Sequence, residues 1–193
     1  MLFRSSGAWL SGHLGIWPAM GATAVVLGVA ALTFEGRAVL GPGLHSRMWL
    51  IGLPAGLLMA GGTVLLFGPI TSAFPGLTED VERLYASFRA PGSAVTLLFM
   101  PLVVTCEEIV WRGAIYEVLR LRMSWVPAVL VGTAAYSAAH LPIGSPALVL
   151  AAIGAGLCWN LIRARTKSLM AALVAHLVWD YAVLVAFDVT ASG

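Results

Sequence analysis

Six long apolar runs dominate the chain and restrict its fold more than any other feature. A helix rises about 1.5 Å per residue, so about 20 apolar residues cross the roughly 30 Å hydrocarbon layer of a bilayer. The runs are His13 to Phe34, Met48 to Thr71, Ser93 to Glu117, Trp125 to His140, Pro146 to Ile162 and Ser168 to Phe187. Because the runs are continuous rather than alternating, we expect an all-α polytopic membrane bundle of about six transmembrane helices.

Composition agrees with a membrane location, since 60% of the 193 residues are hydrophobic and only 10% are charged. No linker or low-complexity tract divides the chain, so residues 1–193 are expected to form a single transmembrane domain. The formal net charge of +2 is too small and dispersed to indicate a nucleic-acid partner. The lipid bilayer is therefore the expected surroundings.

Basic residues are unevenly divided between the two ends of the expected bundle. One end carries seven, namely Arg37, Arg47, Arg120, Arg122, Arg163, Arg165 and Lys167, and the other carries Arg4, Arg83 and Arg89. Because cytoplasmic loops are enriched in Arg and Lys, the larger group is predicted to face the cytoplasm. Both termini would then be non-cytoplasmic, as would a short polar connector at Thr78 to Phe88. The N-terminal run lacks a clear signal-peptide cleavage site, and we interpret it as retained.

Three of the runs contain ionisable residues at membrane depth, where each charge costs roughly 2.5 to 3.5 kcal/mol. They are Glu107, Glu108 and Arg112 in the third run, His140 in the fourth, and His176 and Asp180 in the last. Glu108 and Arg112 are four residues apart on one helix face, so they are expected to form an internal ion pair. Adjacent helical residues differ by about 100° in direction, so Glu107 points elsewhere and is the candidate reactive group.

Several other residues need only packing or interfacial roles. Cys106 and Cys158 both lie inside expected spans, which argues against a disulfide framework and favours packing over a nucleophilic Cys106. Gly52 and Gly56 have the small-residue spacing that allows close helix packing, and they indicate nothing further. His13 and His45 lie near expected membrane interfaces and are assigned no special role.

Three motifs within these runs resemble those of a known family. Glu107-Glu108-x-x-x-Arg112 resembles an EExxxR motif, Tyr136-x-x-x-His140 an FxxxH motif, and His176-x-x-x-Asp180 an Hxxx(N/D) motif. Their order and spacing are similar to those of the CPBP intramembrane proteases, which include the type II CAAX prenyl endopeptidases and bacteriocin-processing relatives. The resemblance extends from Phe99 to Tyr181 and implies a CAAX-protease-like core over residues 99–181. Tyr136 replaces the usual Phe, and Asp180 replaces the Asn of the prenyl-protease branch.

The resemblance implies an intramembrane glutamic endopeptidase that hydrolyses a peptide bond in a membrane-associated protein or peptide. Glu107 with His140 would activate a water, and His176 with Asp180 would stabilise the oxyanion. Glu108, Arg112 and Tyr136 would support this site. Asp180 could donate a hydrogen bond only if protonated, and otherwise it would orient His176 or hold it charged. The short-looped build suggests a prokaryotic plasma membrane.

Alternatives remain open at this point. Glu107, His140 and His176 could together bind zinc, although no HExxH helix is present, and a metal-free reaction without cofactors is favoured. A proton-coupled transporter could use the same residues as a relay, but the chain is short and lacks recognisable transport repeats. A non-proteolytic scaffold or immunity protein could share the fold. Whether the substrate is prenylated, and the oligomeric state, are not indicated by the sequence.

Overall fold

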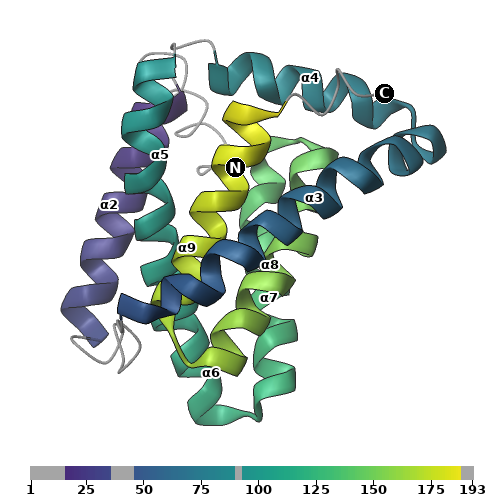
Figure 1. Cartoon of the computed structure of the whole chain (residues 1–193). Helices are drawn as coiled ribbons and strands as arrows, with labels where there is room; N and C mark the ends of the chain where they lie inside the picture. Colours follow the sequence, from purple (N-terminus) through teal and green to yellow (C-terminus); the bar gives the residue numbers. More distant parts are fainter. Residues whose placement is uncertain (1–15, 36–45, 90–92, 188–193) are drawn as a thin grey trace.

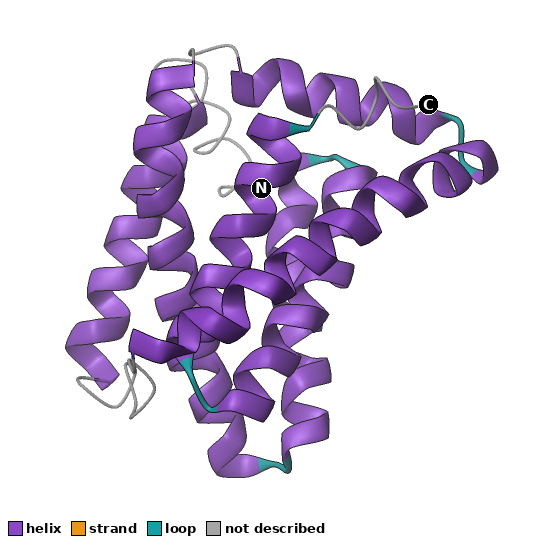
Figure 2. Cartoon of the chain, in the orientation of Figure 1, coloured by secondary structure: helices purple, strands orange, loops and turns teal. Residues whose placement is uncertain are grey.

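The computed structural model describes residues 16–35, 46–89 and 93–187, and over these ranges it contains helices and short turns without a β-strand (Figures 1 and 2). Its longer helices are α2 (Ile16–Glu35), α3 (Trp49–Ala73), α4 (Gly76–Arg89), α5 (Ser93–Glu108), α6 (Tyr116–Arg122), α7 (Trp125–His140), α8 (Pro146–Thr166) and α9 (Leu169–Asp180). The described ranges also contain two π-helical segments, η4 (Ile109–Ile115) and η6 (Tyr181–Ala186). Two short 3-10 helices are η3 (Ser46–Met48) and η5 (Leu141–Ile143). The prediction of an all-α bundle is confirmed.

Helices occupy all six regions in which apolar runs were found. Four stretches are long and apolar enough to cross a membrane by themselves, namely Trp49–Ala73, Trp125–Ile143, Pro146–Thr166 and Leu169–Ala186. The helical path from α5 through η4 to α6 is continuous, but it carries several ionisable residues. The apolar stretch Gly21–Thr33 within α2 is shorter than these four stretches. The chain is therefore an integral membrane protein. The predictions for Arg4, His13, Arg37, His45 and the retained N-terminal segment lie outside the described residues.

The helices that carry the motifs alternate in direction and pack beside one another (Figure 1). The path from α5 to α6 runs from the end marked by α4 to the opposite end of the bundle, α7 returns, α8 descends and α9 returns again. Helix α7 packs along α8, α9 packs along α8 and α5, and α2 packs along α5. This arrangement brings the three motifs from distant parts of the sequence into one layer.

Helix α3 leans across the bundle and packs closely against α9 through Gly52 and Gly56 (Figure 1). A Cβ atom at Gly52 would lie 2.6 Å from the carbonyl oxygen of Ala171, and one at Gly56 would lie 2.7 Å from that of Ala175. Such distances exclude any larger residue unless the backbones separate. The expected packing role is therefore seen, and it fixes α9 where it carries His176.

The structure corrects the expectation of a polar connector at Thr78 to Phe88. This segment belongs to α4, a 14-residue helix that lies across one end of the bundle (Figure 1). Its apolar residues recur at helical spacing and face inward: Leu77, Val81, Leu84, Tyr85 and Phe88. Glu79, Glu82 and Arg83 are exposed. The abundance of polar residues hid an amphipathic period, which is the stronger signal.

Asp80 attaches α4 to the beginning of α8. Its Oδ2 atom accepts hydrogen bonds from Ser145 Oγ at 2.7 Å and from the backbone amide of Ala147 at 2.8 Å. Ser145 Oγ also accepts a bond from the amide of Leu148, so one hydroxyl both caps α8 and joins it to α4. The end of the bundle that α4 covers is thus held by specific polar contacts.

Candidate active site

Glu107 and Glu108 close α5 in the middle of the bundle, and the backbone continues directly into the π-helical segment η4. A π-helical turn shifts the following side chains relative to a regular helix and is frequent at functional sites. Glu108 is fully buried, with 0% of its surface exposed, whereas Glu107 is partly buried. The two neighbouring carboxylates therefore face different surroundings, as the sequence predicted.

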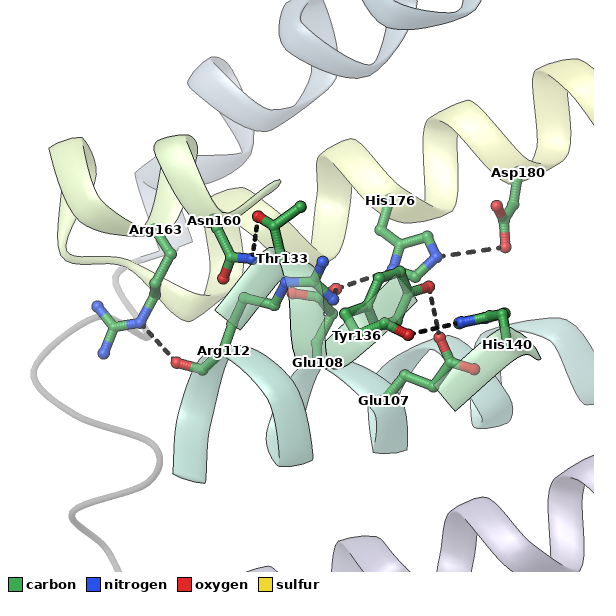
Figure 3. A network of polar contacts seen from close by, with 10 residues as sticks. All are labelled: Glu107, Glu108, Arg112, Thr133, Tyr136, His140, Asn160, Arg163, His176 and Asp180. Carbon is green, nitrogen blue, oxygen red and sulfur yellow. Dashed lines mark hydrogen bonds and ion pairs between the residues drawn. The ribbon is translucent and has the colours of Figure 1, made fainter. Parts of the chain in front are cut away.

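Glu108 forms an ion pair and a hydrogen bond in the interior. Its Oε1 atom lies 2.9 Å from Arg112 Nη1 and 2.8 Å from His176 Nδ1 (Figure 3). The first contact was expected from the spacing, and the second joins residues 68 positions apart. A buried ion pair gains stability only when further hydrogen bonds compensate for lost hydration. The bond to His176 provides such compensation and connects the first motif to the third.

Arg112 is enclosed by aromatic rings as well as by Glu108. Its guanidinium carbon lies 4.5 Å from the centre of the Tyr136 ring and 5.1 Å from that of Trp159. Contacts of this kind stabilise a cation that has left water. The arginine of the first motif therefore supports the position of Tyr136 in the second motif.

Tyr136 directs its hydroxyl group to Glu107. The Tyr136 hydroxyl donates a hydrogen bond of 3.1 Å to Oε2 of Glu107, and the tyrosine ring is buried (Figure 3). Helix α8 approaches the ring so closely that a Cβ atom at Gly156 would lie 2.8 Å from Tyr136 Cδ1. The hydroxyl that distinguishes Tyr136 from phenylalanine thus touches the candidate reactive carboxylate.

His140 is held by its own helix. Its Nδ1 atom lies 2.9 Å from the carbonyl oxygen of Tyr136, and its ring packs 4.6 Å from the Tyr136 ring centre. A carbonyl oxygen can only accept a hydrogen bond, so this contact requires a proton on Nδ1. In the neutral imidazole, Nε2 then keeps its lone pair and can accept a proton. His140 also lines the cavity described below.

Both ring nitrogens of His176 face carboxylates. Nδ1 contacts Glu108, and Nε2 lies 3.6 Å from Oδ2 of Asp180. The imidazole also stacks on the Trp159 ring, with the ring centres 3.5 Å apart and the planes inclined by 23°. An imidazolium has two N–H donors, so its doubly protonated form matches this environment on both sides.

A single cavity of about 700 Å³ lies beside these residues. Glu107, Tyr136, His140, His176 and Asp180 all line it. Most of the remaining wall is apolar and comes from α3, α4 and α8, for example Leu66, Phe67, Val81, Leu84, Leu148 and Ala151. The structure thus brings the four residues predicted to be catalytic to one largely apolar cavity, while Glu108 and Arg112 lie behind its wall.

The zinc alternative concerns Glu107, His140 and His176. Within the described ranges, no three His, Cys, Asp or Glu side chains converge so that they could hold a metal ion. Of the three suggested ligands, His176 directs one nitrogen to Glu108 and the other towards Asp180. No chemical step is therefore assigned to a metal.

Sequence reasoning missed several residues that support the site. Trp159, which stacks on His176, is 1% exposed and lies on α8 outside the three motifs. Arg163 donates from Nε to the backbone carbonyl of Arg112 at 3.0 Å and pairs with Glu117 (Figure 3 shows the first contact). The carbonyl of Arg112 lies within η4, where the helix hydrogen-bond pattern is irregular. Only the unusual occurrence of Trp and Arg in an apolar run could have indicated these roles.

Comparison with known proteins agrees with the motif geometry. Residues 90–182, nearly half of the chain, match the family described as type II CAAX prenyl endopeptidase Rce1-like. No curated protein and no solved structure matches the chain. The matched region contains all three motifs, and at the level of the family it corresponds to a CAAX-type intramembrane endopeptidase acting on membrane-associated proteins. Residues 90–182 are therefore similar to the Rce1-like type II CAAX prenyl endopeptidases, in agreement with the resemblance of the three motifs to the CPBP intramembrane proteases.

Proposed function

We propose that this protein hydrolyses a peptide bond of a membrane-associated protein or peptide, using a water molecule activated by Glu107 and His140. One observation carries the proposal. The Glu107 carboxylate, the His140 imidazole and the His176–Asp180 pair line the same cavity, and Tyr136 holds the carboxylate through a bond of 3.1 Å. Amide hydrolysis needs a base, a proton donor and a group that stabilises negative charge, and these residues can supply all three.

In the proposed reaction, the water oxygen forms a bond to the carbonyl carbon of the substrate while one of its protons passes to Glu107. His140 orients the water through Nε2, which its bond to the Tyr136 carbonyl leaves free. The same proton then passes from Glu107 to the amide nitrogen as the carbon–nitrogen bond breaks. The products are a carboxylic acid, which holds the second proton of the water until it ionises, and an amine, and Glu107 returns to its ionised form.

His176 supplies the stabilising charge for the oxyanion in this proposal. Its contact with Glu108 occupies Nδ1, so Nε2–H is the group available on the cavity side. Asp180 lies 3.6 Å from this nitrogen and favours the charged imidazole. We therefore assign Asp180 an indirect role, in which it keeps His176 protonated rather than donating a hydrogen bond itself. Glu108, Arg112 and Tyr136 position the reacting groups.

The test compares membrane proteins and peptides by mass spectrometry in bacterial cells that express the native chain or Glu107→Gln. Glutamine preserves the size of the side chain and its ability to accept a bond from Tyr136, but it removes the base. Glu82→Gln serves as the matched control, because Glu82 is exposed on α4. Expression and folding of the three chains are compared by quantitative blotting and by elution from a sizing column.

A cleavage product that appears with the native chain and with Glu82→Gln, but not with Glu107→Gln, supports the proposal and identifies the substrate. A product that persists with Glu107→Gln contradicts the assigned base. If no product depends on Glu107 despite broad coverage of membrane peptides, the non-proteolytic scaffold becomes the better account. Neither a scaffold nor a proton relay predicts hydrolysis.

A further inference from the structure

The cavity extends from the candidate active site towards one end of the bundle only. Beyond the site it is lined by the last part of α3, the inner face of α4 and the beginning of α8, including Phe74, Leu77, Ala147 and Leu148. No residue between Ile109 and Ala135 lines it, so η4, α6 and the first turns of α7 take no part. Among the described residues, the route to the catalytic groups therefore lies at the α4 end.

The opposite end of the bundle carries most of the basic residues. In Figure 1 the start of α3, the turn between α6 and α7 and the turn between α8 and α9 all lie at the end away from α4. Six described basic residues occur there, namely Arg47, Arg120, Arg122, Arg163, Arg165 and Lys167. Helix α4 contains only Arg83 and Arg89. Arg and Lys near the ends of membrane spans are enriched on the cytoplasmic side, so the α4 end is inferred to face away from the cytoplasm.

Helix α4 has the character of a helix that lies at the membrane surface. Glu79, Glu82 and Arg83 are exposed on one face, while the opposite face contributes apolar residues to the cavity. An amphipathic helix of this kind lies along the boundary between headgroups and acyl chains. The contacts of Asp80 with Ser145 and Ala147 hold it over the beginning of α8. A polypeptide that approaches from this side would meet α4 first.

We infer that the cavity receives its substrate from the non-cytoplasmic face, and that the substrate is an exported, membrane-anchored polypeptide whose apolar segment occupies the cavity. The apolar wall suits such a segment, and the peptide bond beside it would reach Glu107 from the side of α4. This inference rests on the proposed function for the cleavage step. The sidedness of the cavity does not depend on cleavage and can be measured separately.

The first experiment measures the sidedness of the two ends with a membrane-impermeant maleimide. Single cysteines replace Glu82 on α4 or Lys167 at the end of α8, in a chain whose native cysteines are changed by Cys106→Ala and Cys158→Ala. Both positions are exposed, and neither belongs to the catalytic machinery. We expect Glu82→Cys to react in intact right-side-out vesicles, and Lys167→Cys to react at least tenfold more slowly until the vesicles are permeabilised. Detergent-solubilised protein gives the total reactive cysteine for each variant.

The second experiment uses Cys158, which lines the cavity, as a natural reporter in a Cys106→Ala chain. A small, charged methanethiosulfonate is added to right-side-out and to inside-out vesicles. Faster modification of Cys158 in right-side-out vesicles supports the inference. Equal or faster modification in inside-out vesicles overturns it, as does labelling of Lys167→Cys before Glu82→Cys. Because labelling requires no turnover, a loss of Glu107-dependent cleavage would contradict the proposed function without affecting this result.

Discussion

The Tyr136 hydroxyl donates a hydrogen bond of 3.1 Å to Oε2 of Glu107, which joins the second motif to the first across 29 positions of the sequence. The tyrosine ring is buried and packed against Arg112, so the hydroxyl has a fixed direction. A donor at this distance stabilises the ionised carboxylate and limits its rotation. The position of the proposed base is thus set by the tyrosine that stands at the first position of the FxxxH-like motif.

Replacing this donor tests its contribution. Tyr136→Phe keeps the ring and removes only the hydroxyl, so the chain should fold normally while kcat/KM falls roughly 5- to 15-fold, equivalent to about 1 to 1.5 kcal/mol. The measurement is the rate of product formation in proteoliposomes. Tyr181→Phe is the matched control, since its hydroxyl bonds the carbonyl of Leu97 and Tyr181 does not line the cavity. An unchanged kcat/KM for Tyr136→Phe would show that the bond has no role in catalysis.

A methyl group at Gly156 should disturb the site through the same tyrosine. The added Cβ atom would lie 2.8 Å from Tyr136 Cδ1, so the ring or the backbone of α8 must shift, and we expect the bond from Tyr136 to Glu107 to lengthen. We expect Gly156→Ala to lower kcat at least tenfold or so, because small displacements of catalytic groups are costly. Gly61→Ala, on α3, adds a methyl group with nothing within 4 Å at a position that does not line the cavity, and it should behave as the native chain.

Equal activity of the two glycine variants would mean that catalysis tolerates a displacement of Tyr136. Folding is checked by comparing the yield of monodisperse protein and the near-ultraviolet circular dichroism of both variants. A loss of folded protein restricted to Gly156→Ala would indicate that the close contact matters for stability rather than for geometry.

Much of the fold could be predicted from sequence because each long apolar run has one stable solution in a bilayer, which is a helix. The pair of Glu108 with Arg112 was also predictable, since its geometry is local to one helix. The contact of Glu108 with His176 was not, because it depends on how α5 and α9 pack. The spacing of residues in the sequence predicts which face of a helix a side chain occupies. It does not predict which residue of another helix that side chain contacts.

Two further features escaped prediction for different physical reasons. The amphipathic period of α4 was hidden by its polar composition, although Leu77, Val81 and Leu84 recur at helical spacing. The π-helical segments η4 and η6 follow directly after Glu108 and Asp180, and no sequence pattern indicates their irregular hydrogen bonding. The single-domain organisation of residues 1–193 stays a prediction, as do the catalytic roles, the prokaryotic location and the orientation of the termini.

The attachment of α4 depends on the ionised form of Asp80. Burial alone would raise the pKa of this carboxyl, but bonds from Ser145 and the Ala147 amide and the nearby Arg83 outweigh burial, so its pKa lies below the ordinary value of 3.8. A lowered pKa means that the stabilisation is present above the ordinary value and is lost as pH falls through the lowered one. At neutral pH the stabilisation by ionised Asp80 is fully present.

Asp80→Asn should therefore destabilise the native chain at neutral pH by about 1.5 to 3 kcal/mol, the usual range for hydrogen bonds to a charged group. Thermal unfolding in detergent at several pH values measures the difference. The gap between native and variant should stay constant from pH 8 to pH 5 and narrow only below about pH 4. Glu79→Gln, at an exposed position on the same helix, should change stability little. A gap that narrows between pH 8 and pH 6 would contradict this explanation.

Removal of metal ions should leave proteolysis unchanged. Within the described ranges, no three His, Cys, Asp or Glu side chains are placed so that they could hold a metal ion, and the proposed reaction uses Glu107 and His140 without one. Purified protein is incubated with EDTA or with 1,10-phenanthroline, and turnover is compared with that of untreated protein. Loss of activity that zinc restores would contradict the metal-free reaction and favour the zinc alternative.

We propose that Glu107 activates a water molecule for attack on a peptide bond. The most direct measurement reconstitutes the native chain or Glu107→Gln in liposomes with membrane proteins of the host cell, in water enriched in oxygen-18, and analyses new carboxyl termini by mass spectrometry. We expect a cleaved product that carries oxygen-18 with the native chain and none with folded Glu107→Gln. Equal amounts of labelled product from both chains would contradict it.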